Sequence, residues 1–190
     1  MDEKSVFTRE EAKLNAIPVD ASLEDYFAFT SYNTLPTIKA LALTRMAARP
    51  GFASEMKTLM LNSDAEEAAR VIRLVEEVPQ PAAELIRAVE AVGRDLADRM
   101  RRMNATPANE DPDFLRANDV AIRFSAWIAA AGKLHTKDGA DLVPELQTIV
   151  DLSRVRNDTE VIRQDVRRVA VFYLQEWAGV SPQADDPKPR

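Results

Sequence analysis

Residues 81–103 of this chain read PAAELIRAVEAVGRDLADRMRRM, and their apolar positions recur at alternating steps of three and four. The recurring residues, interrupted only at Arg99, are Ala82, Leu85, Val89, Val92, Leu96 and Met103. This spacing gathers apolar side chains on one face of an α-helix, which has about 3.6 residues per turn. The pattern resembles a heptad seam, but about three heptads are the minimum for a coiled coil. We expect a long helix packed in a bundle, with a coiled coil as the alternative.

Helical spacing also governs most of the remaining sequence. Apolar and polar residues rarely alternate as they do in strands, and the chain has only five glycines. Capping residues followed three positions later by an acid mark helix starts at Thr8, Ser22, Ser63 and Asn157. The predicted helices cover residues 9–17, 22–30, 35–48, 52–61, 64–78, 81–103, 113–131, 140–153 and 158–178. The sequence therefore predicts an all-α fold of eight or nine helices, either an antiparallel bundle or a short irregular array of helical hairpins.

Proline, asparagine and acidic residues gather in the segment 104–112, which has no apolar stripe. This segment either joins two antiparallel helices or separates two subdomains, and whether it is a hinge stays open. We expect residues 1–180 to form a single helical domain. The three prolines and the lack of apolar anchors in residues 181–190 predict a disordered tail.

The charge of the chain is acidic overall, with a formal net value of −6. Each of the four successive segments 1–62, 63–105, 106–157 and 158–190 has a small negative charge. Nucleic-acid-binding proteins are usually basic and concentrate Lys and Arg on one face, so this balance disfavours DNA and RNA as partners. The excess of arginine over lysine suggests a bacterial source.

The chain contains no cysteine, which excludes disulfides, thiolate catalysis and cysteine-ligated metals. It begins without an apolar leader, and no stretch approaches the ~20 apolar residues of a membrane span. We expect a cytoplasmic protein, or a periplasmic one if a leader has been removed.

His135 is the only histidine, and this removes most of the chemistry found in helical enzymes. Paired histidines are required by di-metal bundles and by HExxH zinc sites. The sequence also lacks a Gly-x-Ser-x-Gly elbow, a Ser-x-x-Lys motif and a phosphate-binding glycine loop. His135 falls in the polar segment 133–138, where we expect an exposed loop. We therefore predict no catalytic residue, no metal ligand, no cofactor and no enzymatic activity.

The numerous carboxylates are expected to lie on solvated helix faces. Glu66, Glu90, Asp95 and Asp98 each precede an arginine by four residues, the order that stabilises an exposed helix. A carboxylate-lined cleft that binds a small ligand, or catalyses a reaction on it, remains the alternative.

Two groups of residues are candidates for contacts with a partner. Residues 26–32 contain four aromatic residues in a short helix and turn; they either pack within the chain or, through Tyr26, Phe29 and Tyr32, meet a partner. Trp127 and Trp177 are expected in the core. Arg163, Arg167 and Arg168 form a basic group, as do Arg99, Arg101 and Arg102; they are either neutralised by nearby acids or bind an acidic partner or phosphate.

Residues 140–178 resemble one HEAT repeat. The stretch 142–146 (LVPEL), with its proline in a first helix, is followed by the polar pair at 157–158 and by a second helix containing 161–163 (VIR) and Val166. Leu35-Pro36 and Ser63-Asp64 echo the pattern, without a constant period. The resemblance implies stacked helical hairpins with a protein-binding surface and no enzymatic activity.

Together these features predict a non-enzymatic interaction or scaffold module whose partner is another protein. Homo-oligomerisation stays open. Two hypotheses remain beside it: a small-ligand-binding protein or enzyme with a carboxylate-lined cleft, and a regulator that contacts nucleic acid through a local arginine patch.

Overall fold

The computed structural model describes residues 3–18, 20–31, 33–79, 81–155, 160–181 and 183, without the side chains of residues 3, 4, 108 and 160–163. Helices account for the regular structure of these residues, and none of them forms a strand. The elements are α1 (Glu3–Asn15), η1 (Leu23–Phe29), α2 (Pro36–Ala47), α3 (Phe52–Asn62), α4 (Ala65–Leu74), η2 (Val75–Glu77), α5 (Ala83–Ala105), η3 (Ala108–Glu110), α6 (Leu115–Asp138), α7 (Val143–Ser153) and α8 (Glu160–Ala178). The predicted all-α fold of eight or nine helices is confirmed.

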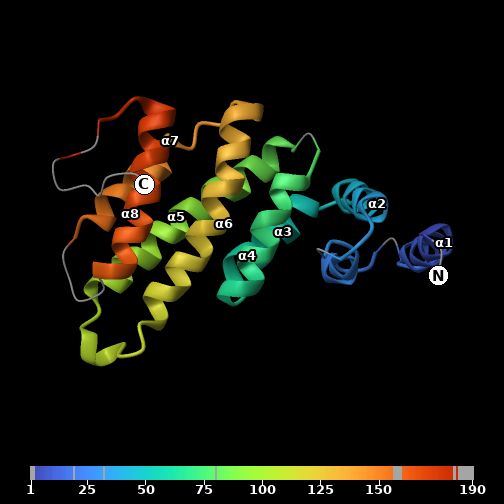
Figure 1. Ribbon diagram of the computed structural model, residues 1–190, viewed down its shortest axis with the longest axis horizontal. Helices are drawn as coiled ribbons and strands as arrows, with labels where there is room; N and C mark the ends of the chain where they lie inside the picture. Colours follow the sequence, from blue (N-terminus) through green and yellow to red (C-terminus); the bar gives the residue numbers. More distant parts are fainter. Residues whose placement is uncertain are drawn as a thin grey trace.

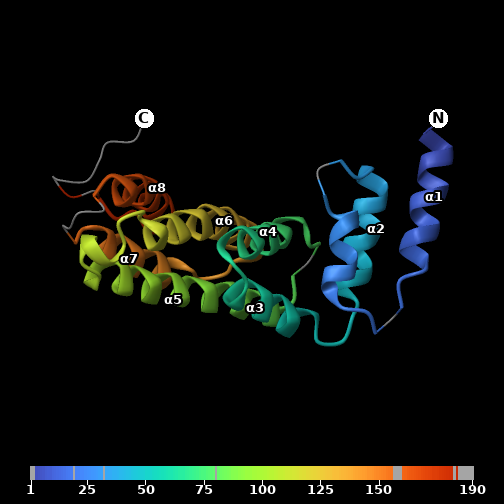
Figure 2. The same ribbon diagram turned by 90° about the horizontal axis from the view of Figure 1, so that it is seen from below.

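Six of these helices form three helical hairpins stacked side by side (Figure 1). Within the hairpins α3 packs on α4, α5 on α6 and α7 on α8. Between hairpins α5 lies between α3 and α7, and α6 lies between α4 and α8. Figure 2 shows the resulting two layers edge-on, α3–α5–α7 in one and α4–α6–α8 in the other.

The hairpins differ in length, so the stack has no regular period. The α3–α4 hairpin spans residues 52–74, α5–α6 spans 83–138 and α7–α8 spans 143–178. As a result the turn between α5 and α6 projects beyond α3 and α4 (Figure 1). Residues 104–112, predicted as a linker, contain the end of α5 and the short η3 and connect the two helices of this hairpin.

The N-terminal elements extend the stack at its α3 side. α1 packs on α2, and η1 packs on α2 and α3 (Figure 2). The side chain of Asp25 accepts a hydrogen bond from the backbone N–H of Ser22, as the sequence predicted for this helix start. Arg45 of α2 donates to the carbonyl oxygen of Leu14 and to the side chain of Asn15, which holds the end of α1.

The core extends through all three hairpins, and Trp127 of α6 lies at its centre with no exposed surface. Its indole nitrogen donates to the carbonyl oxygen of Val89 in α5 at 2.9 Å. Beside it α5 and α7 approach closely at Gly93. A Cβ on this glycine would lie 2.9 Å from both the Cβ of Glu145 and the Cζ2 of Trp127. Only a residue without a side chain fits this crossing.

The end of α6 lies further along the chain than the sequence indicated. The predicted helix stops at residue 131, before the glycine at 132, whereas α6 continues to Asp138 and ends at Gly139 in the left-handed conformation. His135 is therefore on a helix and not in an exposed loop. Its ring stacks on Trp177 at 4.7 Å between centroids, and its Nδ1 lies 3.0 Å from the carbonyl oxygen of Ala140.

No helix among the described residues has both the length and the apolar character required to cross a membrane.

Candidate interaction surface

The aromatic segment 26–32 packs mainly into the protein. Tyr26, Phe27 and Phe29 of η1 are buried in the core, with at most 9% of each residue exposed. Arg49 lies over the Tyr26 ring and Arg70 over the Phe27 ring, each at a cation–π distance. Of the two interpretations of this segment, packing within the chain holds for Tyr26 and Phe29, because η1 packs its three aromatic side chains against α2 and α3. Tyr32 lies outside the described residues.

The C-terminal arginine group does not form an open basic patch in the described part of α8. Arg167 is 9% exposed, and Arg168 pairs with Asp165 at 2.9 Å. The side chain of Arg163 lies outside the description, as do most residues of the predicted tail 181–190. The structure therefore brings Arg167 into the helix packing and leaves Arg168 with a carboxylate neighbour.

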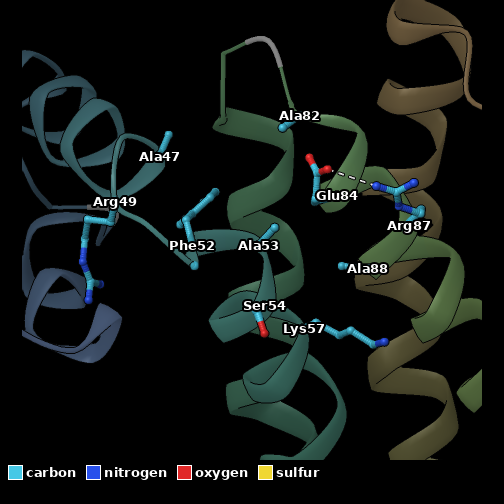
Figure 3. Close-up of a pocket in the computed structure, with 11 residues that line it drawn as sticks. Ala47, Arg49, Phe52, Ala53, Ser54, Lys57, Ala82, Glu84, Arg87 and Ala88 are labelled. Atoms are coloured by element: carbon cyan, nitrogen blue, oxygen red, sulfur yellow. Dashed lines mark hydrogen bonds and ion pairs between the residues drawn. The ribbon is translucent and has the colours of Figure 1, made fainter.

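A surface depression, which we call the α3–α5 groove, lies between α3 and the first two turns of α5 (Figure 3). Its volume is about 520 Å³. Small side chains form much of its lining, and cationic side chains stand at its edges. The lining residues are Ala47, Arg49, Gly51, Phe52, Ala53, Ser54, Lys57, Ala82, Glu84, Arg87 and Ala88.

A second depression, the α5–α7 groove, lies on the other side of α5 and has a volume of about 340 Å³. Its lining again combines small residues with charged ones: Gly93, Arg94, Ala97, Asp98, Arg101, Pro144, Glu145 and Thr148. The close crossing at Gly93 brings α7 down onto α5 here. Both grooves therefore run along helices of one layer, and together they form what we call the α3–α5–α7 face.

Three exposed arginines at intervals of seven residues follow α5 along this face. Arg87 lines the first groove, and Arg94 and Arg101 line the second. Each pairs with a carboxylate: Arg87 with Glu84 at 3.0 Å, Arg94 with Glu145 at 2.9 Å, and Arg101 with Asp98. The face thus presents side chains of both signs on a floor of small residues, and Lys57 adds a cation that has no ion-pair partner among the described residues.

A buried ion cluster was missed in the sequence. Arg123 of α6, only 2% exposed, donates to Asp119 and to the carbonyl oxygens of Met60 and Ser63 at the end of α3. Arg99 of α5 donates to Asp95, to the other oxygen of Asp119 and to the carbonyl oxygen of Leu61. The two arginines satisfy carbonyl groups that the end of α3 leaves without helical partners.

The pKa of Arg99 reflects this cluster. Burial alone would lower it, but the hydrogen bonds and the charges of Asp95 and Asp119 outweigh burial and raise the pKa above its usual value. The prediction that Asp95–Arg99 belongs to a solvated helix face is therefore wrong in one respect. The pair exists at 2.6 Å, but it is partly buried and holds two hairpins together. In the sequence, the only sign of this ion cluster is the interruption of the apolar stripe of α5 at Arg99.

Few titratable side chains among the described residues are arranged for metal binding or have shifted pKa values. No group of three or more His, Asp or Glu side chains there is placed to bind a metal ion. Desolvation and the charge of neighbouring Glu77 raise the pKa of Glu76, but this exposed residue belongs to η2 and lines neither groove. Burial lowers the pKa of Lys133, whose ammonium group donates to the carbonyl oxygens of Val75 and Val78.

Comparison with known proteins adds no family to this description. The chain matches no protein-family model, and neither the curated proteins nor the solved structures contain a significant match.

Proposed function

We propose that this chain is a non-enzymatic protein-interaction module that binds a segment of another protein on its α3–α5–α7 face. The observation that carries the proposal is the pair of grooves flanking α5 on one layer of stacked helical hairpins. Stacked hairpins in general bury a continuous core between neighbours and leave a long face for binding. Small residues such as Ala53 and Thr148 allow a partner backbone to approach this face closely.

The HEAT resemblance of residues 140–178 supports the same proposal. α7 and α8 pack as one hairpin, and its first helix contains Pro144, which is consistent with the proline in the first helix of the repeat pattern. We propose that this hairpin is a HEAT-like unit at the end of an irregular array. The unequal lengths of the three hairpins argue against a series of equal repeats.

The test fills each groove with one large side chain. Ser54→Trp would occupy the α3–α5 groove and Thr148→Trp the α5–α7 groove. Ser125→Trp is the matched control, because Ser125 is exposed on α6 in the other layer. The four purified proteins, all shown to be folded by circular dichroism, serve as baits for affinity capture from a lysate of the native host, followed by mass spectrometry.

A partner retained by the wild type and by Ser125→Trp, and lost with one or both groove variants, is the expected result. Equal retention by all four baits would place the binding surface elsewhere. If none of the four retains a partner at stoichiometric amounts, the interaction function itself is rejected and small-ligand binding becomes the leading hypothesis.

A further inference from the structure

A small pocket lies between the end of α5 and the start of α6, away from the α3–α5–α7 face. Its volume is about 300 Å³, and its lining residues are Arg99, Arg102, Leu115, Arg116 and Asp119. The pocket exists because the α3–α4 hairpin is short. The carbonyl groups at the end of α3 reach only Arg99 and Arg123, so the last turns of α5 and the first turn of α6 extend beyond them.

Two of the three arginines in this pocket have no carboxylate partner among the described residues. Asp119 is fully engaged, with one oxygen accepting from Arg123 at 2.9 Å and the other from Arg99 at 3.1 Å. Arg116 donates only to the hydroxyl of Thr106, and no ion pair of Arg102 occurs within the described chain. The pocket therefore has an uncompensated positive charge, although the whole chain is acidic.

An exposed apolar pair adjoins these arginines. Leu115 is 67% exposed and lines the pocket, and its neighbour Phe114 is 37% exposed. The turn that places them is fixed by Asp111, whose two carboxylate oxygens accept from the N–H groups of Leu115 and Arg116. Phe114 sits at this turn with a φ of 53°. Aromatic residues and arginine are enriched at protein contacts, so an exposed apolar pair beside two arginines fits such a contact.

We propose that this pocket, defined by Arg102, Arg116 and Leu115, binds a peptide segment of a partner in which an acidic residue neighbours an apolar one. The carboxylate would accept from the two guanidinium groups, whose planar donors suit bidentate binding. The apolar side chain would cover Leu115 and Phe114. A nucleic acid is disfavoured, because it would leave these two apolar side chains exposed and would meet the acidic remainder of the chain.

The pocket volume is at the lower end of the range for ligand sites, which suits one or two side chains of a peptide. This site is independent of the α3–α5–α7 face, since the two share no lining residue. Its failure would leave the proposed function of that face untouched, and the reverse also holds.

The experiment selects ligands from a random peptide library displayed on phage, with the purified full chain as the target. Selected peptides are then synthesised and their affinities measured by fluorescence polarisation against the wild type and variants. The informative variants are Arg102→Glu/Arg116→Glu and Leu115→Ser, all at exposed positions. Lys137→Glu is the control charge reversal, because Lys137 is exposed on α6 and lines neither this pocket nor the two grooves.

We expect selected peptides enriched in Asp or Glu next to Leu, Ile or Phe. Their affinity should fall at least about tenfold with the double charge reversal and about fivefold with Leu115→Ser, and stay within about twofold with Lys137→Glu. Binding should also weaken as salt is raised, since the contact is electrostatic in part.

Three outcomes overturn the proposal. One is a selection that yields no binders, or binders without acidic residues. Another is equal binding to the double variant and to the wild type. The third is a single-stranded oligonucleotide that binds the wild type more tightly than any selected peptide and is lost with the double variant, which would assign the pocket to nucleic acid.

Discussion

The two sides of the central α5–α6 hairpin are joined to their neighbours by different physics. On the α3–α4 side, buried Arg123 and partly buried Arg99 bind the carbonyl groups at the end of α3. On the α7–α8 side, α5 and α7 cross at Gly93 with the buried Trp127 beneath them. At the first seam, arginine side chains bind the carbonyl groups of a helix end, whereas the second combines a close helix crossing with one ion pair, Arg94–Glu145.

The difference follows from where each neighbouring helix ends along α5, since α3 and α7 are both 11 residues long. α3 ends about midway along α5, so its terminal carbonyl groups face the side of a neighbouring helix and need donors. α7 extends toward the end of α5, where the amide of Asn104 donates to the carbonyl oxygen of Leu152, and an ion pair between Arg94 and Glu145 also joins the two helices. A helix can therefore end partway along its neighbour in an irregular array if an arginine of that neighbour binds its terminal carbonyl groups.

The largest expected effect is the loss of the charged seam. Arg123→Met should destabilise the protein by about 3 kcal/mol, because it leaves the carbonyl groups of Met60 and Ser63 buried without donors and removes one partner of Asp119. Urea denaturation followed by circular dichroism measures the change. Arg101→Met, at an arginine that is 55% exposed, is the control and should change stability by less than about 0.5 kcal/mol. Equal effects of the two substitutions would show that the cluster does not join the hairpins.

Two glycine-to-alanine substitutions test the close packing between α5 and α7, with Gly93 at the crossing and Gly132 of α6 as the comparison. Gly93→Ala should destabilise by about 1–2 kcal/mol, because the new Cβ meets Trp127 and Glu145 at 2.9 Å and the overpacking exceeds the gain in helix propensity. Gly132→Ala in α6 should instead stabilise by about 0.5–1 kcal/mol, since its Cβ would have ordinary contacts at 3.8 Å with Tyr173 and Trp177. Thermal unfolding of both variants should give shifts of opposite sign. A stabilising Gly93→Ala would refute the close crossing.

A smaller effect is expected at the end of α4, where Lys133 and Glu76 lie close together. Burial and Glu77 raise the pKa of Glu76 in the folded protein, with Arg73 and Lys133 opposing them. The folded state then holds this proton to a higher pH than the unfolded chain. The stability that Glu76 contributes is therefore present below the unfolded pKa and is lost as pH rises through the folded value.

Glu76→Gln should remove this loss and stabilise the protein at pH 7 by about 0.5 kcal/mol or less, because the group is largely solvated. The gain should shrink toward zero as the pH is lowered through about 4.5, as chemical denaturation at several pH values would show. Glu176→Gln on exposed α8 is the control. A gain that does not vary with pH would mean that desolvation does not raise the pKa of Glu76 in the folded protein.

The smallest effect concerns the exposed arginine stripe of α5. Arg87→Ala breaks an ion pair in which both side chains are 65% exposed, so stability should change by less than about 0.3 kcal/mol. Binding to a partner at the α3–α5 groove should nevertheless weaken. A loss of stability comparable to that of Arg123→Met would show that the stripe supports the fold and not the surface.

Much of the fold was accessible from the sequence because helix signals are local. The apolar spacing of residues 81–103 gave a helix that the structure places at Ala83–Ala105, and the predicted 35–48 helix is Pro36–Ala47. Prolines and capping residues fix such boundaries within a turn or so. The exception is α1, which begins at Glu3, so the predicted cap Thr8 lies inside the helix. The prediction for α6 was wrong at its end, because Gly132 lies where Tyr173 and Trp177 pack against the helix and stabilise its continuation.

The candidate surface was less predictable. Tyr26 and Phe29 were candidates for a partner contact, but the apolar surface that buries them comes from helices distant in sequence. Arg99 and Arg102 each follow an aspartate by four residues, so local sequence does not distinguish them. Only the position of the α3–α4 turn decides that Arg99 binds the carbonyl oxygen of Leu61 and that Arg102 lines a surface pocket.

The sequence by itself determined that this chain is helical and where most of its helices lie. It also excluded chemistry that requires cysteine or more than one histidine. These properties depend on residue type and on spacing within a few turns. The tertiary structure alone decided which arginines are buried, how the hairpins stack into two layers, and where grooves remain between them. Those properties depend on contacts between residues far apart in the chain, such as Arg123 with Met60. The local spacing of residues does not predict such contacts.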